Sequence, residues 1–198
     1  MIAEYHHVLG ILGAVLGACL YAYYHATIWL GRTRPHLFTW LSYGFINGVV
    51  FIAQVLKGGG AGSWTMAVAT VGVLSVAIVA LWKGEKVIAK VDWLSFVGVL
   101  IGIMLWIATS DALYAVVIAT LINALGFVPT VRKSIYKPWE EPAIGWSLSV
   151  LQFGFGAVAL ESFTLTTALF PIAVAAMNAA FVAMLLIRRR QLAAVNLL

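Results

Sequence analysis

Long apolar runs dominate the chain, and short stretches between them collect the charged residues, glycines and prolines. The runs cover residues 8–30, 37–56, 62–82, 93–109, 112–133, 143–160 and 163–187. Most are close to the roughly 20 apolar residues that an α-helix needs to cross a bilayer, and the run at 93–109 is the shortest. The pattern predicts an all-α membrane protein with seven transmembrane helices in a single transmembrane domain, residues 1–198.

Composition excludes a soluble domain. The chain is 63% hydrophobic and 10% charged, whereas soluble domains are roughly 45–50% apolar and 25% charged. Seven spans use nearly all of the 198 residues, so we expect no separate extramembrane domain. The first run lacks a positively charged leader and is too long for a signal peptide, which predicts a retained first helix. Cys19 has no partner in the chain for a disulfide.

The basic residues fix an expected orientation. They follow the first, third, fifth and seventh runs, and Lys57 alone falls on the opposite side. Cytoplasmic loops carry the excess of Lys and Arg, so we expect an inner-membrane protein with its N-terminus outside and its C-terminus in the cytoplasm. The net charge of +5 is then a topology signal that also favours anionic lipid headgroups, with no nucleic-acid partner.

The chain also contains an internal repeat. "RTRPHLFTW" opens the second run and "WEEPAIGW" opens the sixth, so Pro35 with Trp40 corresponds to Pro142 with Trp146. A basic cluster follows each tryptophan at nearly the same distance. Duplicated units of this kind are common in transporters. We therefore predict a parallel 3+1+3 arrangement: residues 1–83 form the first three-helix repeat, 84–110 a linker with the fourth helix, and 111–198 the second repeat.

Pro129 lies inside the predicted helix 112–133. A proline there removes a backbone hydrogen bond and bends the helix. The bend is a candidate hinge or gate, or else a passive kink.

The predicted spans hold no Asp, Glu, Lys or Arg deep in the membrane; the polar groups there are uncharged. Four amides lie near the middle of their runs: Asn47, Asn123, Gln152 and Asn178. Because lipid offers them no hydrogen bonds, we expect these side chains to point into the bundle. They either bond neighbouring helices or, together with Trp146, form a substrate-binding site for a neutral hydroxylated or heterocyclic solute.

The residues that a metal site or an enzyme active site would need are not found together in the sequence. His6 and His7 are adjacent on a helix and do not converge on one ion, so we expect no metal site and no cofactor. No nucleophile, base and orienting group can be placed together, so we do not expect an enzyme.

The stretch "GFVPTVRKSIYKP" followed by "GWSLSVLQFG" resembles the PQ-loop superfamily, which includes the SWEET sugar transporters. Pro129-Thr130 stands where that family has its proline-glutamine pair. The resemblance implies a parallel 3+1+3 fold and gives Asn178 the role of the asparagine in the third helix of a repeat. The chain also resembles a group of uncharacterised bacterial membrane proteins, through Arg34-Pro35-His36 with Thr39-Trp40 and through Pro129-Thr130 with Lys133.

These observations predict a facilitative transporter of a small neutral solute. Two alternatives stay open: a seven-helix ligand-binding or sensing protein, as the KDEL receptor of the same superfamily is, and an accessory membrane protein without transport. Gly13 and Gly17 give the first helix a small-residue face of the kind that packs helices closely, and a homo-oligomer is possible.

Overall fold

A computed structural model describes residues 2–84 and 90–195, apart from the side chains of a few helical positions such as Pro129. The described residues are helical, with no strand among them. The α-helices are α1 (Ile2–Trp29), α2 (Leu37–Leu56), α3 (Ser63–Lys83), α4 (Lys90–Thr109), α5 (Ala112–Tyr136), α6 (Ala143–Val158) and α7 (Leu165–Val195). Short 3-10 turns lie at η1 (Gly60–Gly62) and η2 (Pro138–Glu140). Residues 85–89 of the expected linker lie outside this description.

Five of these helices are long and apolar enough to cross a membrane. The stretches, taken over the described residues, are Glu4–Trp29, Leu37–Leu56, Gly60–Lys83, Ala112–Tyr136 and Leu165–Ala193. The apolar helices Leu100–Thr109, within α4, and Ala143–Val158, which is α6, are shorter. At 1.5 Å per residue, the 16 residues of α6 fall short of a hydrocarbon core of roughly 30 Å. The membrane character of the chain is thus clear, while the count of seven spans stays a prediction.

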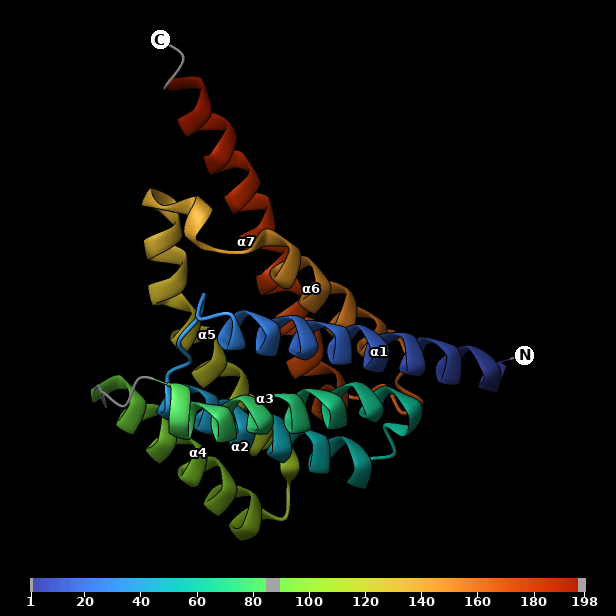
Figure 1. The fold of residues 1–198 in the computed structure, drawn as a ribbon. Coiled ribbons are helices and arrows are strands. Elements are labelled where there is room, and N and C mark those ends of the chain that lie inside the picture. The colour runs from blue at the N-terminus through green and yellow to red at the C-terminus, as the bar shows by residue number, and fades with distance from the viewer. Residues whose placement is uncertain (1, 85–89, 196–198) are drawn as a thin grey trace.

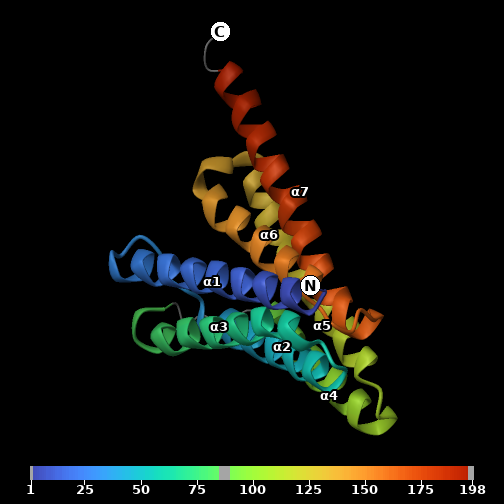
Figure 2. The same cartoon turned by 90° about the vertical axis from the view of Figure 1, so that its right-hand side faces the viewer.

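For description we divide the helices into two units, with α4 between them in the chain and packed against α5 and α2. In the first unit, residues 2–83, α3 packs against both α1 and α2; in the second unit, residues 112–195, α7 packs against both α5 and α6. Between the units α1 packs on α6 and α2 on α5. The helices of the first unit run side by side, and α7 crosses them and projects beyond the bundle toward its C-terminus (Figures 1 and 2).

Side chains at the loop ends fix where helices begin. The Asp111 carboxylate accepts a hydrogen bond from the Leu113 backbone N–H at 2.9 Å, which caps α5. At α7, the hydroxyls of Thr164 and Thr167 each accept a hydrogen bond from the other's backbone N–H, at 3.3 and 2.9 Å. This reciprocal arrangement satisfies donors that a helix N-terminus leaves free.

Two arginines of α7 hold the crossing between α5 and α6. Arg188 Nε donates to the Ile135 carbonyl at 2.9 Å, and Arg189 donates to the carbonyls of Pro138 and Glu141, at 2.7 Å for the second. The carbonyls at the end of α5 have no partner within their own helix. The basic cluster near the C-terminal end of α7 therefore has a structural task besides any effect on topology.

Much of the outer surface is apolar. Every long helix presents large hydrophobic side chains outward, among them Val15 on α1, Val71 on α3, Leu125 on α5 and Ile172 on α7. A water-soluble monomer rarely exposes a continuous apolar surface of this extent. The bundle has instead the surface of a protein embedded in a membrane.

Candidate functional site

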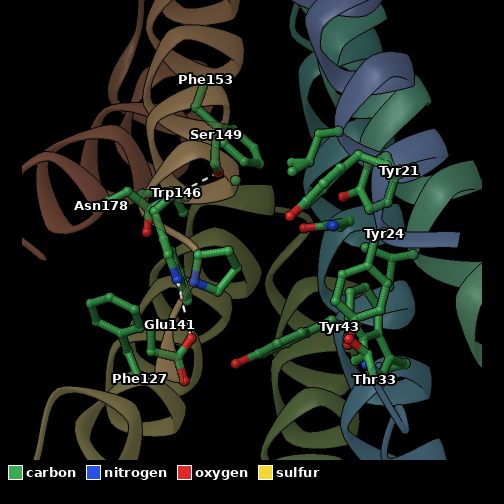
Figure 3. Close-up of a pocket in the computed structure, with 18 of the residues that line it drawn as sticks. Tyr21, Tyr24, Thr33, Tyr43, Phe127, Glu141, Trp146, Ser149, Phe153 and Asn178 are labelled. Atoms are coloured by element: carbon green, nitrogen blue, oxygen red, sulfur yellow. Dashed lines mark hydrogen bonds between the residues drawn. The ribbon is translucent and has the colours of Figure 1, made fainter. Parts of the chain in front are cut away.

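A cavity of about 580 Å³ lies between the two units. One wall comes from α1, α2, α3 and the segment 30–36, and the other comes from α5, α6 and α7 (Figure 3). Arg32 and Arg34 stand at its rim and are exposed, while Phe153 and Phe170 close its inner end and belong to the packed core. The cavity therefore reaches the surface at the side of segments 30–36 and 137–142, which we call the arginine end.

Aromatic rings line both walls. On the first unit the rings of Tyr24 and Trp40 pack at a tilt of 45° with centroids 4.6 Å apart. On the second unit Trp146 packs against Phe127 at 5.2 Å and edge-on against Phe181 at 4.9 Å. The two tryptophans of the sequence repeat thus lie on opposite walls of one cavity.

Three of the four predicted amides line this cavity, namely Asn47, Asn123 and Asn178. Asn178 Nδ2 donates to the Ser149 hydroxyl at 2.8 Å, which fixes the direction of that amide (Figure 3). Asn47 is only 7% exposed. Together with Trp146, these residues line one cavity; their role in binding a solute stays a prediction.

Gln152 is not part of the cavity lining. Its side chain is fully buried where α1, α3 and α6 meet, against Gly17 of α1. Among the described residues, neither its amide nitrogen nor its amide oxygen has a hydrogen-bond partner. Ser149 and Phe153, on either side of it in α6, do line the cavity.

The rim holds the remaining charge. The Glu141 carboxylate accepts a hydrogen bond from Trp146 Nε1 at 3.3 Å, and both residues line the cavity (Figure 3). The sequence alone gives no reason to connect Glu141 with Trp146, because the contact depends on how segment 137–142 folds back over α6.

Beyond the inner end of the cavity, two turns meet at the opposite end of the bundle. We call this the glycine end; it comprises Lys57–Gly62, between α2 and α3, and residues 159–164, between α6 and α7. The Glu161 N–H donates to the Gly59 carbonyl at 3.2 Å, and the Ser162 N–H donates to the Gly58 carbonyl at 3.1 Å. Glu161 Oε1 accepts in turn from the Ala61 N–H at 3.1 Å. These bonds join the first unit to the second.

The proposed hinge, Pro129, lies within α5, but its side chain is outside the described part of the structure. A second internal proline, Pro171, lies in α7 and was missed in the sequence analysis. It has no N–H to donate to the carbonyl of Thr167 four residues earlier. That carbonyl accepts a hydrogen bond from Gln54 Nε2 of α2 at 2.7 Å instead.

Gln54 was also missed as a polar residue of the interior. It is 1% exposed and bridges the two units near the glycine end. A signal was available, since a proline within a helix leaves one known carbonyl free and a buried amide needs a partner. Only the fold shows that the two meet.

No protein-family model matches the chain, and neither a curated protein nor a solved structure shows significant similarity to it.

Proposed function

We propose that the protein is a facilitative transporter that carries a small neutral solute across the inner membrane. The observation that carries this proposal is the cavity of about 580 Å³ between two three-helix units. It lies within the range of roughly 300–1,000 Å³ that is usual for small-molecule sites. It is reached from one end and closed at the other, as alternating access requires of a carrier.

The lining supports a neutral solute. The charged side chains of the cavity, those of Arg32, Arg34 and Glu141, belong to the rim segments. Deeper in, the polar groups of the lining are carboxamides and hydroxyls, and the rest of the lining is aromatic or aliphatic. A solute with an apolar ring face and a hydrogen-bonding edge, whether hydroxylated or heterocyclic, would lay its face on the aromatic walls and its edge against Asn47, Asn123 and Asn178.

The packing of the helices supports movement of two similar units. Exchanging α1, α2 and α3 for α5, α6 and α7 reproduces the contacts: α3 on α6 becomes α7 on α2, and α1 on α6 becomes α5 on α2. This is the pattern expected of the parallel 3+1+3 repeat. In such carriers one unit rocks against the other around a central site.

The positive-inside rule places the arginine end in the cytoplasm. On that orientation the cavity faces inward in this state, and the glycine end faces the exterior. Solute would enter from outside only after the contacts between the two turns of the glycine end have separated.

Reconstitution in liposomes tests the proposal. A panel of neutral hydroxylated and heterocyclic solutes is measured for binding and for flux, with the parent protein and with Asn178→Leu. The variant leaves a polar group of the solute unpaired, so affinity should fall by about 5- to 150-fold, whereas the folded bundle loses only about 0.6 kcal/mol, the average for a membrane hydrogen bond.

Ser149→Ala is the comparison variant. It removes one hydroxyl of the lining, the partner of Asn178, but leaves the Asn178 amide in the cavity, so affinity should fall less than in Asn178→Leu. Binding without flux would favour a sensing protein. Loss of thermal stability in Asn178→Leu, with no solute bound by the parent, would favour an accessory protein and end the transport proposal.

A further inference from the structure

We propose that the seam where α1, α3 and α6 meet is the gate that opens the cavity toward the glycine end, and that Gln152 lines the solute path when this gate is open. The proposal rests on the proposed transport function and identifies a path residue that the arginine-open cavity does not contain.

The helices of the seam contact one another at glycines. Gly13 of α1 lies so close to α3 and α6 that a methyl group there would clash with Thr65 Oγ1, and one on Gly17 would clash with the Gln152 amide. Gly156 of α6 is equally close to Thr65. Helices that touch through glycines can approach closely and can part without disengaging large side chains.

The seam is also polar in a way that its closed form does not satisfy. The Gln152 amide and the Thr65 hydroxyl are buried there without a hydrogen-bond partner in the described part of the chain. Leaving such groups unpaired is costly, and an amide that served only to join helices would be bonded to one of them. A separated seam would give both groups water or solute as partners.

Gln152 stands next to the cavity along α6. Ser149, three residues before it and on the neighbouring surface of the helix, lines the cavity, as does Phe153. Separation of α1 from α6 at Gly17 would therefore extend the cavity past Ser149 to the Gln152 amide, and from there toward the turns of the glycine end.

The latch above the seam consists of hydrogen bonds between the two turns of the glycine end. The Ser162 N–H donates to the carbonyl of Gly58, which is exposed, and the Glu161 N–H donates to the carbonyl of Gly59, which is buried. Water can replace the first bond directly and the second once the turns begin to part. Gly58 and Gly60 have φ values of 72° and 56°, a conformation that glycine adopts without strain, so the turn can re-form after opening.

Thiol labelling tests the gate without a known solute. In a Cys19→Ser background, single cysteines are placed in the seam by Thr65→Cys and by Gln152→Cys, and a membrane-impermeant methanethiosulfonate reagent is added from each side. Val50→Cys is the buried control, since Val50 is fully buried in the core outside the seam. Lys57→Cys identifies the side on which the glycine end lies.

We expect both seam cysteines to react from the glycine side at least about tenfold faster than the cysteine at position 50. Adding Gln152→Met to Thr65→Cys removes the unpaired amide from the closed seam, so the closed form becomes more stable relative to the open form. Labelling of the cysteine at position 65 should therefore slow by about fivefold or more. Gln152→Asn keeps an amide and should label as the parent does.

Seam cysteines as unreactive as the cysteine at position 50 would overturn the gate, even if solute flux is observed, and the transport proposal would then stand alone. A Gln152→Met variant that melts at a lower temperature and leaves labelling unchanged would assign Gln152 to packing. Reactive seam cysteines with no solute moved would instead separate an opening gate from transport.

Discussion

The two ends of the bundle differ in whether their hydrogen bonds lie within one unit or join the two units. At the arginine end the units stand apart around a cavity, and Arg188, Arg189 and Trp146 bond to residues of their own unit. At the glycine end the units touch, and the bonds of Gln54 and Glu161 cross from one unit to the other. The arginine end is thus ordered by bonds within one unit, and the glycine end is joined by bonds between the units, of which the Gln54–Thr167 bond is buried.

This difference indicates how a small bundle can hold its two units together at one end and leave a cavity between them at the other. Side chains that order the open rim do so within one unit, so they resist closure only weakly. Bonds between units are collected at the other end, where glycines bring the helices together. The comparison predicts that changes at the two ends differ in kind as well as in size.

The largest expected effect concerns which compartment each end faces. Reporters that are active on only one side of the membrane, fused at residue 60 and after residue 198, should give opposite signals, with residue 60 outside and the C-terminus in the cytoplasm. The basic residues of the arginine end are the physical reason. If both fusions report the same compartment, the odd number of spans is wrong.

A smaller effect is expected from the bond between Gln54 and the Thr167 carbonyl. Gln54→Leu leaves that carbonyl unpaired and should lower the free energy of unfolding in detergent by about 1 kcal/mol. It should also raise labelling of Thr65→Cys, because a bond between the units is lost.

Pro171→Ala provides the control, since residue 171 then has an N–H that can bond the Thr167 carbonyl as in an ordinary helix. In that background Gln54→Leu should lower the free energy of unfolding by less than half as much as it does in the parent. Equal costs in both backgrounds would show that the amide is not compensating for the proline.

The smallest effect is expected at the arginine end. Trp146→Phe removes the hydrogen bond to Glu141 but keeps an aromatic ring against Phe127 and Phe181. The free energy of unfolding should fall by only about 0.5 kcal/mol. Labelling of Thr65→Cys should stay as in the parent because the bond lies within one unit. Labelling that rises as much as in Gln54→Leu would contradict the contrast between the ends.

Helix positions were predictable from the sequence to within a few residues at most ends. The run at 37–56 is α2, and the run at 112–133 begins α5, which continues to Tyr136. Apolar runs between charges and glycines carry this information directly. The amides were correctly expected inside the bundle, because lipid cannot satisfy them.

The face that each residue presents was not predictable. A helix that is apolar on all sides gives no periodicity to show which side meets which neighbour. Gln152 and Asn47 each lie near the middle of a predicted span. Gln152 nevertheless lies in the seam, and Asn47 lines the cavity. The partnership of Gln54 with Thr167 likewise depends on the rotation of α2 against α7.

The length of α7 has a practical consequence for imaging. The protein has a mass of 21.4 kDa, which gives electron microscopy little signal to align. Because α7 stays helical to Val195, projects from the bundle (Figure 1) and is clamped to segment 135–141 by Arg188 and Arg189, a helical scaffold fused in frame at Gln191 would continue it as one rigid rod. Such a fiducial would report the orientation of the second unit directly, so particles with the two ends in different states could be sorted by the angle of the rod.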